Sequence, residues 1–257
     1  MKLNFLVIGE ICTDKFIYGK ASRLSPEAPV PIFTPIKTQT NGGMALNTYN
    51  NLLAIINKND KKHSVDTILS ELCSTKIRYV DIKTNHYFLR VDEEDKFDRF
   101  KIDATIKKKI LKADCIIISD YDKGYLNIED FKKIYNLKKI STPIFLDTKK
   151  KLCHNIFHWV DYIKVNESEY YDNIESYDRG YYKKKIIATL GDKGASFDNQ
   201  NYPSVNPQNT IDVSGAGDTF MAAMCYKYMD KRDIPEAITY ANIMAAQVVM
   251  KRGVSTI

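Results

Sequence analysis

Short runs of consecutive hydrophobic residues alternate along this chain with segments in which hydrophobic residues recur at every third or fourth position. A continuous run rich in Ile and Val predicts a strand that is buried on both faces, because neither side of such a strand favours contact with water. Five segments have this pattern: 2–9, 114–119, 143–147, 160–165 and 185–191.

Helical spacing is found between and after these runs. Segments 104–113 and 127–139 carry hydrophobic residues on one side and lysines on the other. From Ser214 to about Met250 the pattern predicts two further helices, with a break near Asp233–Pro235. Strands that alternate with helices are typical of a parallel sheet covered by helices on both faces. We therefore expect an α/β fold of three layers.

Two regions depart from this rhythm. Segments 30–38 and 86–102 mix polar and hydrophobic residues in the manner of extended strands with one solvated face, and the second segment has a turn signal at Asp92–Asp95. We expect them to form a small sheet that lies over the main sheet as a lid.

Composition and charge narrow the functional classes. A chain of 257 residues, 44% hydrophobic and 27% charged, can bury the core of one enzyme-sized domain. The net charge of +6 comes from lysines scattered in short runs, which are typical of solvated helix faces and not of a nucleic-acid site. The five cysteines form no Cys-x-x-Cys pair, and no hydrophobic stretch is long enough to span a bilayer. We expect a cytoplasmic protein without nucleic-acid or membrane partners.

The segment IDVSGAGDTF (211–220) is the first candidate for chemistry. Gly215, Ala216 and Gly217 precede an apolar helical stretch, so they lie where free backbone N–H groups and the helix dipole bind anions. Asp218 then falls in the first helical turn and can accept a proton from a hydroxyl that attacks such an anion. Alternatively, the glycines only turn the chain and Asp218 only caps the helix.

The segment TLGDKG (189–194) follows a predicted strand and offers a second glycine loop. Gly191 and Gly194 would allow a nucleotide to approach the backbone closely. The chain has neither a Walker loop nor a Gly-x-Gly-x-x-Gly fingerprint, and taken by itself the segment is better explained by a plain hairpin turn.

The segment VNESEY (165–170) places Asn166 and Glu169 three residues apart at an expected helix start, where both side chains can face one point. Oxygen ligands of this kind suit a hydrated magnesium ion held partly by substrate phosphates. The alternative is a capping box, in which Glu169 folds back onto the backbone of Asn166.

The segment NGGMALN (41–47) combines Gly42 and Gly43 with Asn47, and Asp14 follows the first predicted strand. Glycines, an amide and a carboxylate suit a ligand with many hydroxyl groups, because each hydroxyl needs a donor and an acceptor. A simple turn and helix cap is the alternative.

These motifs occur in the order and spacing of the ribokinase-like (PfkB-type) carbohydrate kinases, which the chain resembles over nearly its whole length. The segment GKASRLSPEAPVPIF (19–33) narrows the resemblance, since it is similar to D-glycero-D-manno-heptose 7-phosphate kinases, the kinase half of bifunctional ADP-heptose synthesis proteins. The segments SDYDKGYL (119–126) and ANIMAAQVVMKRGVSTI (241–257) are similar to that subfamily as well.

The resemblance implies a ribokinase-like three-layer α/β/α sandwich with a mostly parallel central sheet and a small β-lid. It implies one kinase domain over residues 1–257, with lid strands from about 15–40 and 80–102, and a homodimer through the lid. The implied reaction transfers the γ-phosphate of ATP to the anomeric hydroxyl of heptose 7-phosphate. The implied cofactors are ATP, Mg²⁺ and a monovalent cation near Asp212.

The resemblance also assigns residues to roles. Asp218 matches the catalytic base, and Gly215, Ala216 and Gly217 match the anion hole. The magnesium-associated positions are Asn166 and Glu169, and the nucleotide positions are Asn166, Thr189, Gly191, Gly194 and Asn242. The sugar positions are Asp14, Gly42, Gly43 and Asn47, and the candidates for holding phosphate are Arg23, Arg90, Lys123 and Lys149.

Some positions depart from the family pattern. Gly9–Glu10 replaces Gly-Asp, Ser214 replaces Thr, and segment 55–69 is shorter than the family's strand and glycine-containing loop require. The shortened segment leaves two alternatives open, a kinase of another sugar or sugar phosphate and a non-catalytic nucleotide-binding protein.

Overall fold

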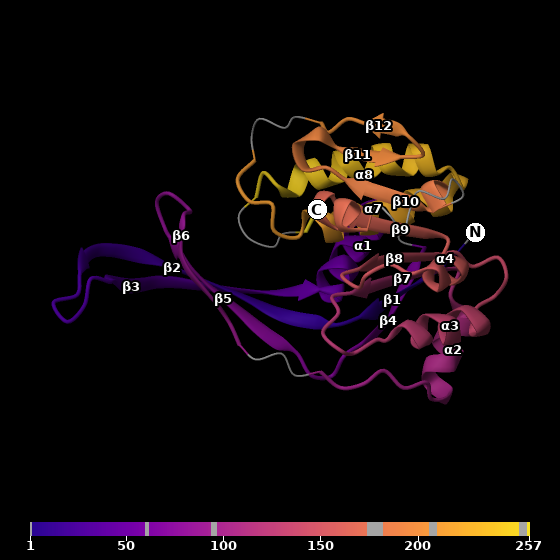
Figure 1. Cartoon of the computed structure of the whole chain (residues 1–257), viewed down its shortest axis with the longest axis horizontal. Coiled ribbons are helices and arrows are strands. Elements are labelled where there is room, and N and C mark those ends of the chain that lie inside the picture. The colour runs from indigo at the N-terminus through magenta and orange to yellow at the C-terminus, as the bar shows by residue number, and fades with distance from the viewer. Residues whose placement is uncertain (1, 60–61, 94–96, 174–181, 206–209, 252–255) are drawn as a thin grey trace.

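The computed structural model describes residues 2–59, 62–93, 97–173, 182–205, 210–251 and 256–257. A larger sheet is covered by helices, and a smaller sheet projects from it as a long arm (Figure 1). None of the described helices combines the length and the hydrophobicity that crossing a membrane requires.

The larger sheet has the strand order β12-β11-β10-β9-β8-β7-β1-β4. Pairing is parallel from β4 to β10, and the last two strands are antiparallel. The strands are β1 (Asn4–Gly9), β4 (Ser64–Leu69), β7 (Cys115–Asp120), β8 (Ile144–Thr148), β9 (Tyr162–Asn166), β10 (Ile186–Thr189), β11 (Ala195–Phe197) and β12 (Gln200–Tyr202). The predicted mostly parallel sheet is confirmed, and each of the five predicted runs overlaps one of its strands.

Strand β4 is not predicted by the hydrophobic pattern because polar residues interrupt it at Ser64, Asp66 and Thr67. It lies in the shortened segment 55–69 and pairs with β1 at the edge of the larger sheet. The segment therefore still supplies one strand.

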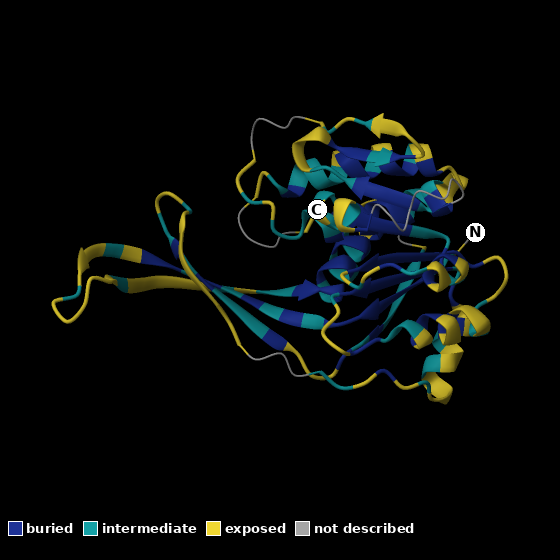
Figure 2. Ribbon diagram, in the orientation of Figure 1, coloured by how far each residue is buried: buried dark blue, intermediate teal, exposed yellow. Residues whose placement is uncertain are grey.

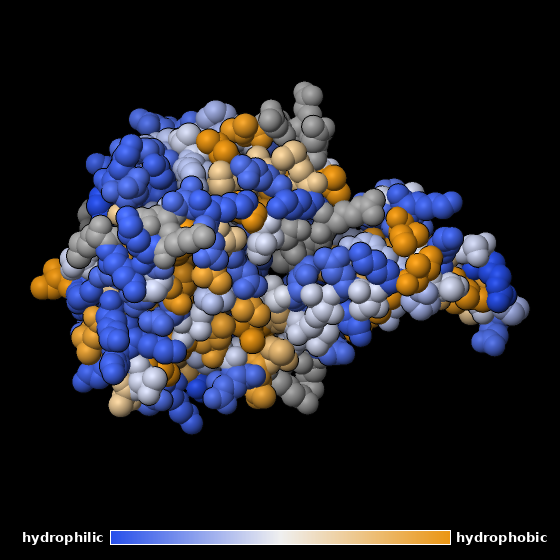
Figure 3. Space-filling model, turned by 180° about the vertical axis from the view of Figure 1, so that it is seen from behind, coloured by the Kyte–Doolittle hydropathy of each residue, from blue (hydrophilic) through white to orange (hydrophobic). Residues whose placement is uncertain are grey.

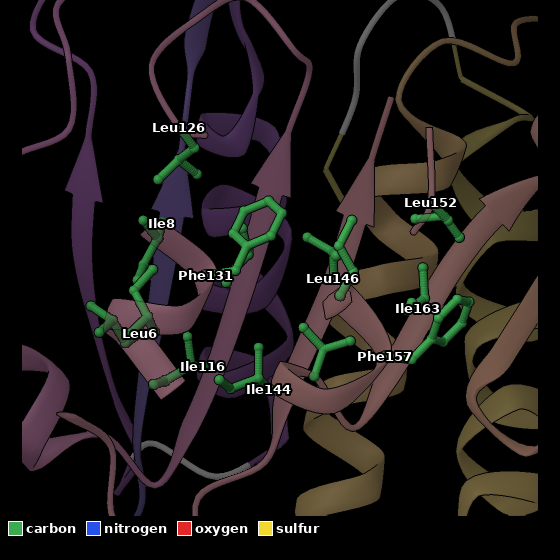
Figure 4. Close-up of a cluster of buried hydrophobic side chains, with 14 of the residues drawn as sticks. Leu6, Ile8, Ile116, Leu126, Phe131, Ile144, Leu146, Leu152, Phe157 and Ile163 are labelled. Atoms are coloured by element: carbon green, nitrogen blue, oxygen red, sulfur yellow. The ribbon is translucent and has the colours of Figure 1, made fainter. Parts of the chain in front are cut away.

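Alternating side chains of the larger sheet enter two separate cores. In β1, Leu6 and Ile8 belong to one core, whereas Phe5 and Val7 belong to the other. Figure 4 shows part of the first core. It is covered by α2 (Ala104–Lys112), α3 (Ile128–Leu137) and α4 (His154–Trp159), and the second core by α1 (Ala45–Asn59), α7 (Ala216–Lys231) and α8 (Ile234–Val248). Two helical layers around one sheet confirm the three-layer prediction.

Several helix starts follow ordinary capping rules, whereas α7 begins differently. The side chains of Asp103, Asn127 and Asp233 accept backbone N–H groups at the starts of α2, α3 and α8. Helix α7 instead begins after Gly215, which has a left-handed φ of 81° and provides no side-chain cap. Short helical segments complete the chain: α5 (Glu167–Asp172), η1 (Tyr182–Lys185) and η2 (Gly191–Lys193).

The smaller sheet has the order β3-β2-β5-β6. Its strands are β2 (Ile11–Leu24), β3 (Pro31–Met44), β5 (Ser74–Asp81) and β6 (Tyr87–Asp92), with β2 and β5 parallel and the other pairs antiparallel. Its outer end is exposed, whereas its base is buried next to the larger sheet (Figure 2).

The expected lid strands, 15–40 and 80–102, need correction. Residues 97–103 form no strand, because Phe97, Phe100 and Ile102 pack against the first core of the larger sheet. Part of the turn expected at Asp92–Asp95 lies outside the described residues. The glycines of NGGMALN also end strand β3, and helix α1 begins only at Ala45.

Candidate active site

Two cavities meet at the carboxyl ends of the parallel strands. One, of about 550 Å³, is lined by residues from five segments, including Tyr121, Asp147, Lys164, Asn166 and Asp218. The other, of about 290 Å³, shares Thr189, Gly191 and Gly217 with the first. Ligands of open α/β sheets bind at this edge, so the cavities form one candidate site.

Asp218 lies in the first turn of α7 and is only 5% exposed. Its Oδ2 accepts a hydrogen bond from Asn47 Nδ2 at 2.9 Å, and its Oδ1 accepts one from the Tyr121 hydroxyl at 2.9 Å. The pKa of Asp218 is raised to about 6, mainly because the carboxylate is buried; Asp147 contributes to the rise, while Asn47, Lys164 and Tyr121 oppose it. The carboxylate is ionised at neutral pH and still basic enough to accept a proton.

The predicted anion hole lies directly beside this carboxylate. Gly215 and Gly217 line the larger cavity, and Ala216 and Gly217 line the smaller one. No side chain caps α7, and the N–H groups of Ala216 and Thr219 donate to the carbonyl oxygens of Val213 and Gly215. The N–H groups of Gly217 and Asp218 are therefore the ones that an anion could bind. The structure therefore favours the chemical interpretation of this segment over a simple cap.

The residues predicted to bind the nucleotide line the smaller cavity, except for Asn166, which lines the larger one. Gly194 has a φ of 94°, and a Cβ there would overlap the carbonyl oxygen of Tyr202. Asn242 Nδ2 donates to that same oxygen at 2.9 Å. The TLGDKG loop is thus both a turn between β10 and β11 and a cavity wall, so the two interpretations are compatible.

Asn166 and Glu169 form the capping box that was the alternative to a magnesium site. Asn166 Oδ1 accepts from the Glu169 N–H at 2.9 Å, and Glu169 Oε2 accepts from the Asn166 N–H at 2.8 Å. Glu169 Oε1 also forms an ion pair with Lys149. Because these bonds occupy the carboxylate, the residues fit a magnesium ion held through water and phosphate better than direct ligation. Within the described part of the chain, His, Cys, Asp and Glu residues form no metal-binding group of three or more.

The residues predicted to bind the sugar lie at the base of the lid. Asp14 on β2 is buried and forms an ion pair with Arg78 on β5. Gly43 lies beside it on β3, where a Cβ would overlap the Asp14 carboxylate. Gly42 lines a further cavity together with Asn47, whose amide also contacts Asp218.

The four candidates for binding phosphate do not gather at one point. Arg90 on β6 lies opposite Arg78 in the sheet register and binds Asp92 through two hydrogen bonds of 2.7 Å. Lys149 lines the larger cavity, whereas Lys123 is exposed in the loop after β7. Arg23 is exposed near the outer end of β2, nine positions along the strand from Asp14, and that length of strand spans roughly 30 Å. The length of the strand therefore keeps Arg23 away from its own chain's site.

Tyr121 is a site residue that the sequence did not reveal, although its segment SDYDKGYL was noted. Two ammonium groups lie over its ring, Lys76 Nζ at 5.5 Å and Lys149 Nζ at 5.7 Å from the ring centre. Glu10, one of the departures from the family pattern, holds the loop, since its carboxylate accepts from the Tyr121 N–H at 2.8 Å and the Lys123 N–H at 3.2 Å. This unusual residue therefore supports the loop that carries Tyr121 to Asp218.

Lys164 and Asp147 form a buried ion pair in the site that the sequence patterns did not predict. Lys164 Nζ donates to Asp147 Oδ2 at 2.6 Å, and both side chains are buried. Desolvation, the largest cause, lowers the pKa of Lys164, but Asp147, Asp218 and Glu169 together outweigh it and the pKa is raised, so the ammonium form persists. A lysine within the buried strand YIKVN was the available signal, because charged residues are rarely buried without a partner.

Comparison with known proteins agrees with this geometry. Residues 54–257 match the family described as pfkB family carbohydrate kinase. The chain is 30% identical to "Bifunctional protein HldE" of Nitratiruptor sp. over 300 residues, which cover 100% of this chain and 63% of the relative. The chain thus spans less than two thirds of that protein's length.

Two solved structures share the fold. Ribokinase of Arabidopsis thaliana, complexed with ribose and ATP, has a TM-score of 0.67 at 14% identity and matches 98% of this chain and 94% of its own. Phosphofructokinase-2 of Escherichia coli, in complex with potassium, has a TM-score of 0.68 at 12% identity with the same coverage. The ribokinase-like fold is confirmed.

Proposed function

Because the chain belongs to the pfkB family of carbohydrate kinases, we propose that its acceptor is D-glycero-D-manno-heptose 7-phosphate, phosphorylated by ATP on the anomeric hydroxyl. The observation that carries the proposal is Asp218, a buried carboxylate with a raised pKa that lines the larger cavity at a helix start without a side-chain cap. The SPEAPVP run and the similarity to HldE support the choice of sugar.

In the proposed reaction, Asp218 accepts the proton of the anomeric hydroxyl as its oxygen attacks the γ-phosphorus. A bond forms between that oxygen and phosphorus, the bond from phosphorus to the β–γ bridging oxygen breaks, and ADP leaves. Asn47 and Tyr121 orient the carboxylate through their hydrogen bonds of 2.9 Å. The pKa of about 6 supports this role, because a base near neutrality is efficient at neutral pH.

The N–H groups of the first turn of α7 would bind the oxygens of the transferred group. Asn166 and Glu169 would hold a magnesium ion through water, and that ion would neutralise phosphate charge. Asp212 is our candidate for a monovalent cation, with support from the potassium bound by phosphofructokinase-2. Its side chain accepts hydrogen bonds from the Tyr87 hydroxyl at 3.2 Å and the Ser214 N–H at 2.9 Å.

The lid supports a sugar that carries a phosphate. In the sheet register Lys76 pairs with Asp14, and Arg78 pairs with Arg90, so these side chains share one face. A sugar phosphate has hydroxyl groups at one end and a phosphate at the other. The carboxylate suits the hydroxyl groups, and the row of cations suits the phosphate.

We also propose that the protein is a cytoplasmic homodimer that pairs through its lid. All five cysteines are free, as in a reducing compartment. Figure 3 shows hydrophobic patches on one face of the projecting arm. The exposed hydrophobic residues of the smaller sheet and its β2–β3 turn are Leu24, Val30, Ile36, Tyr87, Phe88, Leu89 and Val91. A second lid would cover them.

The test is ADP release from ATP and Mg²⁺ with heptose 7-phosphate, fructose 6-phosphate, ribose and fructose. We expect kcat/KM for heptose 7-phosphate to exceed the values for the other sugars by about 100-fold or more, because a sugar without this phosphate would lack charge-assisted hydrogen bonds to the cations of the lid. If another sugar is preferred, the proposed acceptor is wrong, and the protein is a kinase of that sugar, the alternative that the shortened segment 55–69 left open. Nucleotide binding without turnover of any sugar would contradict the proposed reaction.

A further inference from the structure

We propose that Lys164 is a catalytic residue whose ammonium group contacts the phosphoryl group during its transfer. The inference depends on ATP-dependent transfer at Asp218, as proposed above, and does not depend on which sugar is the acceptor.

The position of Lys164 carries the inference. It lies on β9, is 4% exposed, and lines the larger cavity together with Gly215, Gly217 and Asp218. A Cβ built on Gly217 would lie 3.0 Å from Lys164 Nζ, so the ammonium group lies against the first turn of α7. That turn is the uncapped one, where an anion is expected.

The electrostatics of this contact favour an incoming anion. A buried ammonium group and the positive end of a helix repel each other, and burying the ammonium group already has a desolvation cost. Asp147 Oδ2, which lies 2.6 Å from Lys164 Nζ, compensates part of the ammonium charge. The other oxygen, Asp147 Oδ1, has no hydrogen-bond partner among the described residues. An anion bound between the amides and Lys164 would interact favourably with both positive groups.

Other cations near the site are placed differently. Lys149 also lines the cavity, but its side chain is 36% exposed and paired with Glu169. Lys76 belongs to the lid and lies over the ring of Tyr121. Lys164 is also close enough to lower the pKa of Asp218, so its charge lies near the reacting hydroxyl as well as the anion hole.

The role requires no covalent chemistry. Negative charge spreads over the three equatorial phosphoryl oxygens during transfer, and a fixed ammonium group stabilises that charge by donating hydrogen bonds. The proton of the sugar hydroxyl goes to Asp218, and Lys164 keeps its own protons throughout.

The first test compares two variants. Lys164→Gln alone would leave Asp147 buried without its counter-ion and could fail to fold, so Asp147→Asn serves as the reference and Asp147→Asn/Lys164→Gln as the test. The neutral pair can keep a hydrogen bond but lacks the ammonium group. We expect the double variant to have a kcat about 10²- to 10³-fold below that of the reference, with a similar melting temperature. Equal kcat values would overturn the inference.

The second test measures binding and needs no turnover. Calorimetry gives the affinities for ADP and for the non-hydrolysable analogue AMP-PNP, which differ by the group that Lys164 would contact. We expect the ratio of AMP-PNP to ADP affinity to fall about tenfold from reference to double variant, because one charge-assisted hydrogen bond is lost. An unchanged ratio would overturn the inference.

The tests also separate this inference from the proposed function. Kinetics use whichever sugar the wild type phosphorylates best, so a wrong acceptor leaves the comparison intact. If the wild type phosphorylates no sugar, the proposed reaction fails, and the affinity ratio alone decides whether Lys164 contacts the terminal phosphate.

Discussion

At the scale of single residues, the protonation of Asp218 reflects a balance between burial and hydrogen bonding. Burial in the site raises its pKa, and hydrogen bonds from Asn47 and Tyr121 stabilise the ionised form and limit the rise. Lys164 and Asp147 act in opposite directions on the same group, with Lys164 lowering its pKa and Asp147 raising it. Since only the ionised base is active, we expect kcat/KM to fall as the pH drops through about 6.

Tyr121→Phe tests this balance. Removing the hydroxyl removes a contribution that lowers the pKa of Asp218, so the pKa rises and the acid limb of the kcat/KM profile moves to higher pH. A hydrogen bond to a charged group contributes about 1.5 kcal/mol, which corresponds to a shift of up to about one pH unit. The measurement is the pH profile of kcat/KM.

Tyr125→Phe is the matched control for that experiment. Tyr125 lies in the segment that follows Tyr121, but its ring packs against Phe100 in the first core of the larger sheet. We expect this variant to keep the wild-type acid limb. An acid limb that stays in place in Tyr121→Phe would contradict the role given to the Tyr121 hydroxyl.

At the scale of elements, the sequence predicts what depends on local patterns. The buried strands and helices α2, α3, α7 and α8 have continuous or helical hydrophobic patterns that are visible in short windows. Strand β5 has no such pattern, because Lys76 and Arg78 lie on the face that it turns toward Asp14. Lys76 and Arg78 alternate there with Ile77 and Tyr79, so β5 has the period-two pattern of a half-buried strand and no continuous hydrophobic run.

Site residues follow the same division. Asp218 and the glycines before it lie in one short motif, so the sequence is sufficient to find them. Tyr121 and Lys164 meet Asp218 and Gly217 only through the order of strands in the sheet, from segments far apart in the chain. Arg23 was proposed from its motif, and only the observed length of β2 shows how far it lies from Asp14.

Gly194→Ala tests whether the loop after β10 shapes the nucleotide cavity. Gly124→Ala is its matched control, since the two glycines have φ values of 94° and 98° and only Gly194 would clash, with the Tyr202 and Ser204 backbone. Strain at positive φ costs about 1–2 kcal/mol in both. We expect only Gly194→Ala to lose ADP affinity, by about tenfold or more, measured by calorimetry. Equal ADP affinities in the two variants would show that the loop after β10 does not contribute to nucleotide binding.

At the scale of the whole molecule, the projecting arm is the feature least explained by one chain. Strands β3 and β6 are the edges of the smaller sheet, and an isolated sheet with exposed hydrophobic residues favours association. Pairing through the arm would also place the arm of one chain next to the other chain of the dimer.

Leu89→Lys tests the proposed dimer, because Leu89 is exposed on edge strand β6. We expect light scattering to show that the wild type is a dimer. The dimer of the variant should dissociate at a protein concentration roughly 10-fold or more above that of the wild type, because a charge replaces a hydrophobic side chain that the proposed dimer would bury. Ile140→Lys is the control, as Ile140 is exposed between α3 and β8, away from the lid. A monomeric wild type would contradict the dimer.

The most direct test of the central claim is phosphorus NMR of the reaction of ATP, Mg²⁺ and heptose 7-phosphate with the wild type and with Asp218→Asn. We predict ADP together with a heptose that carries a second phosphate on its anomeric carbon, formed by the folded variant about 10²- to 10⁴-fold more slowly because it lacks the base. Equal rates in the two proteins, or no new phosphate on the anomeric carbon with the wild type, would contradict it.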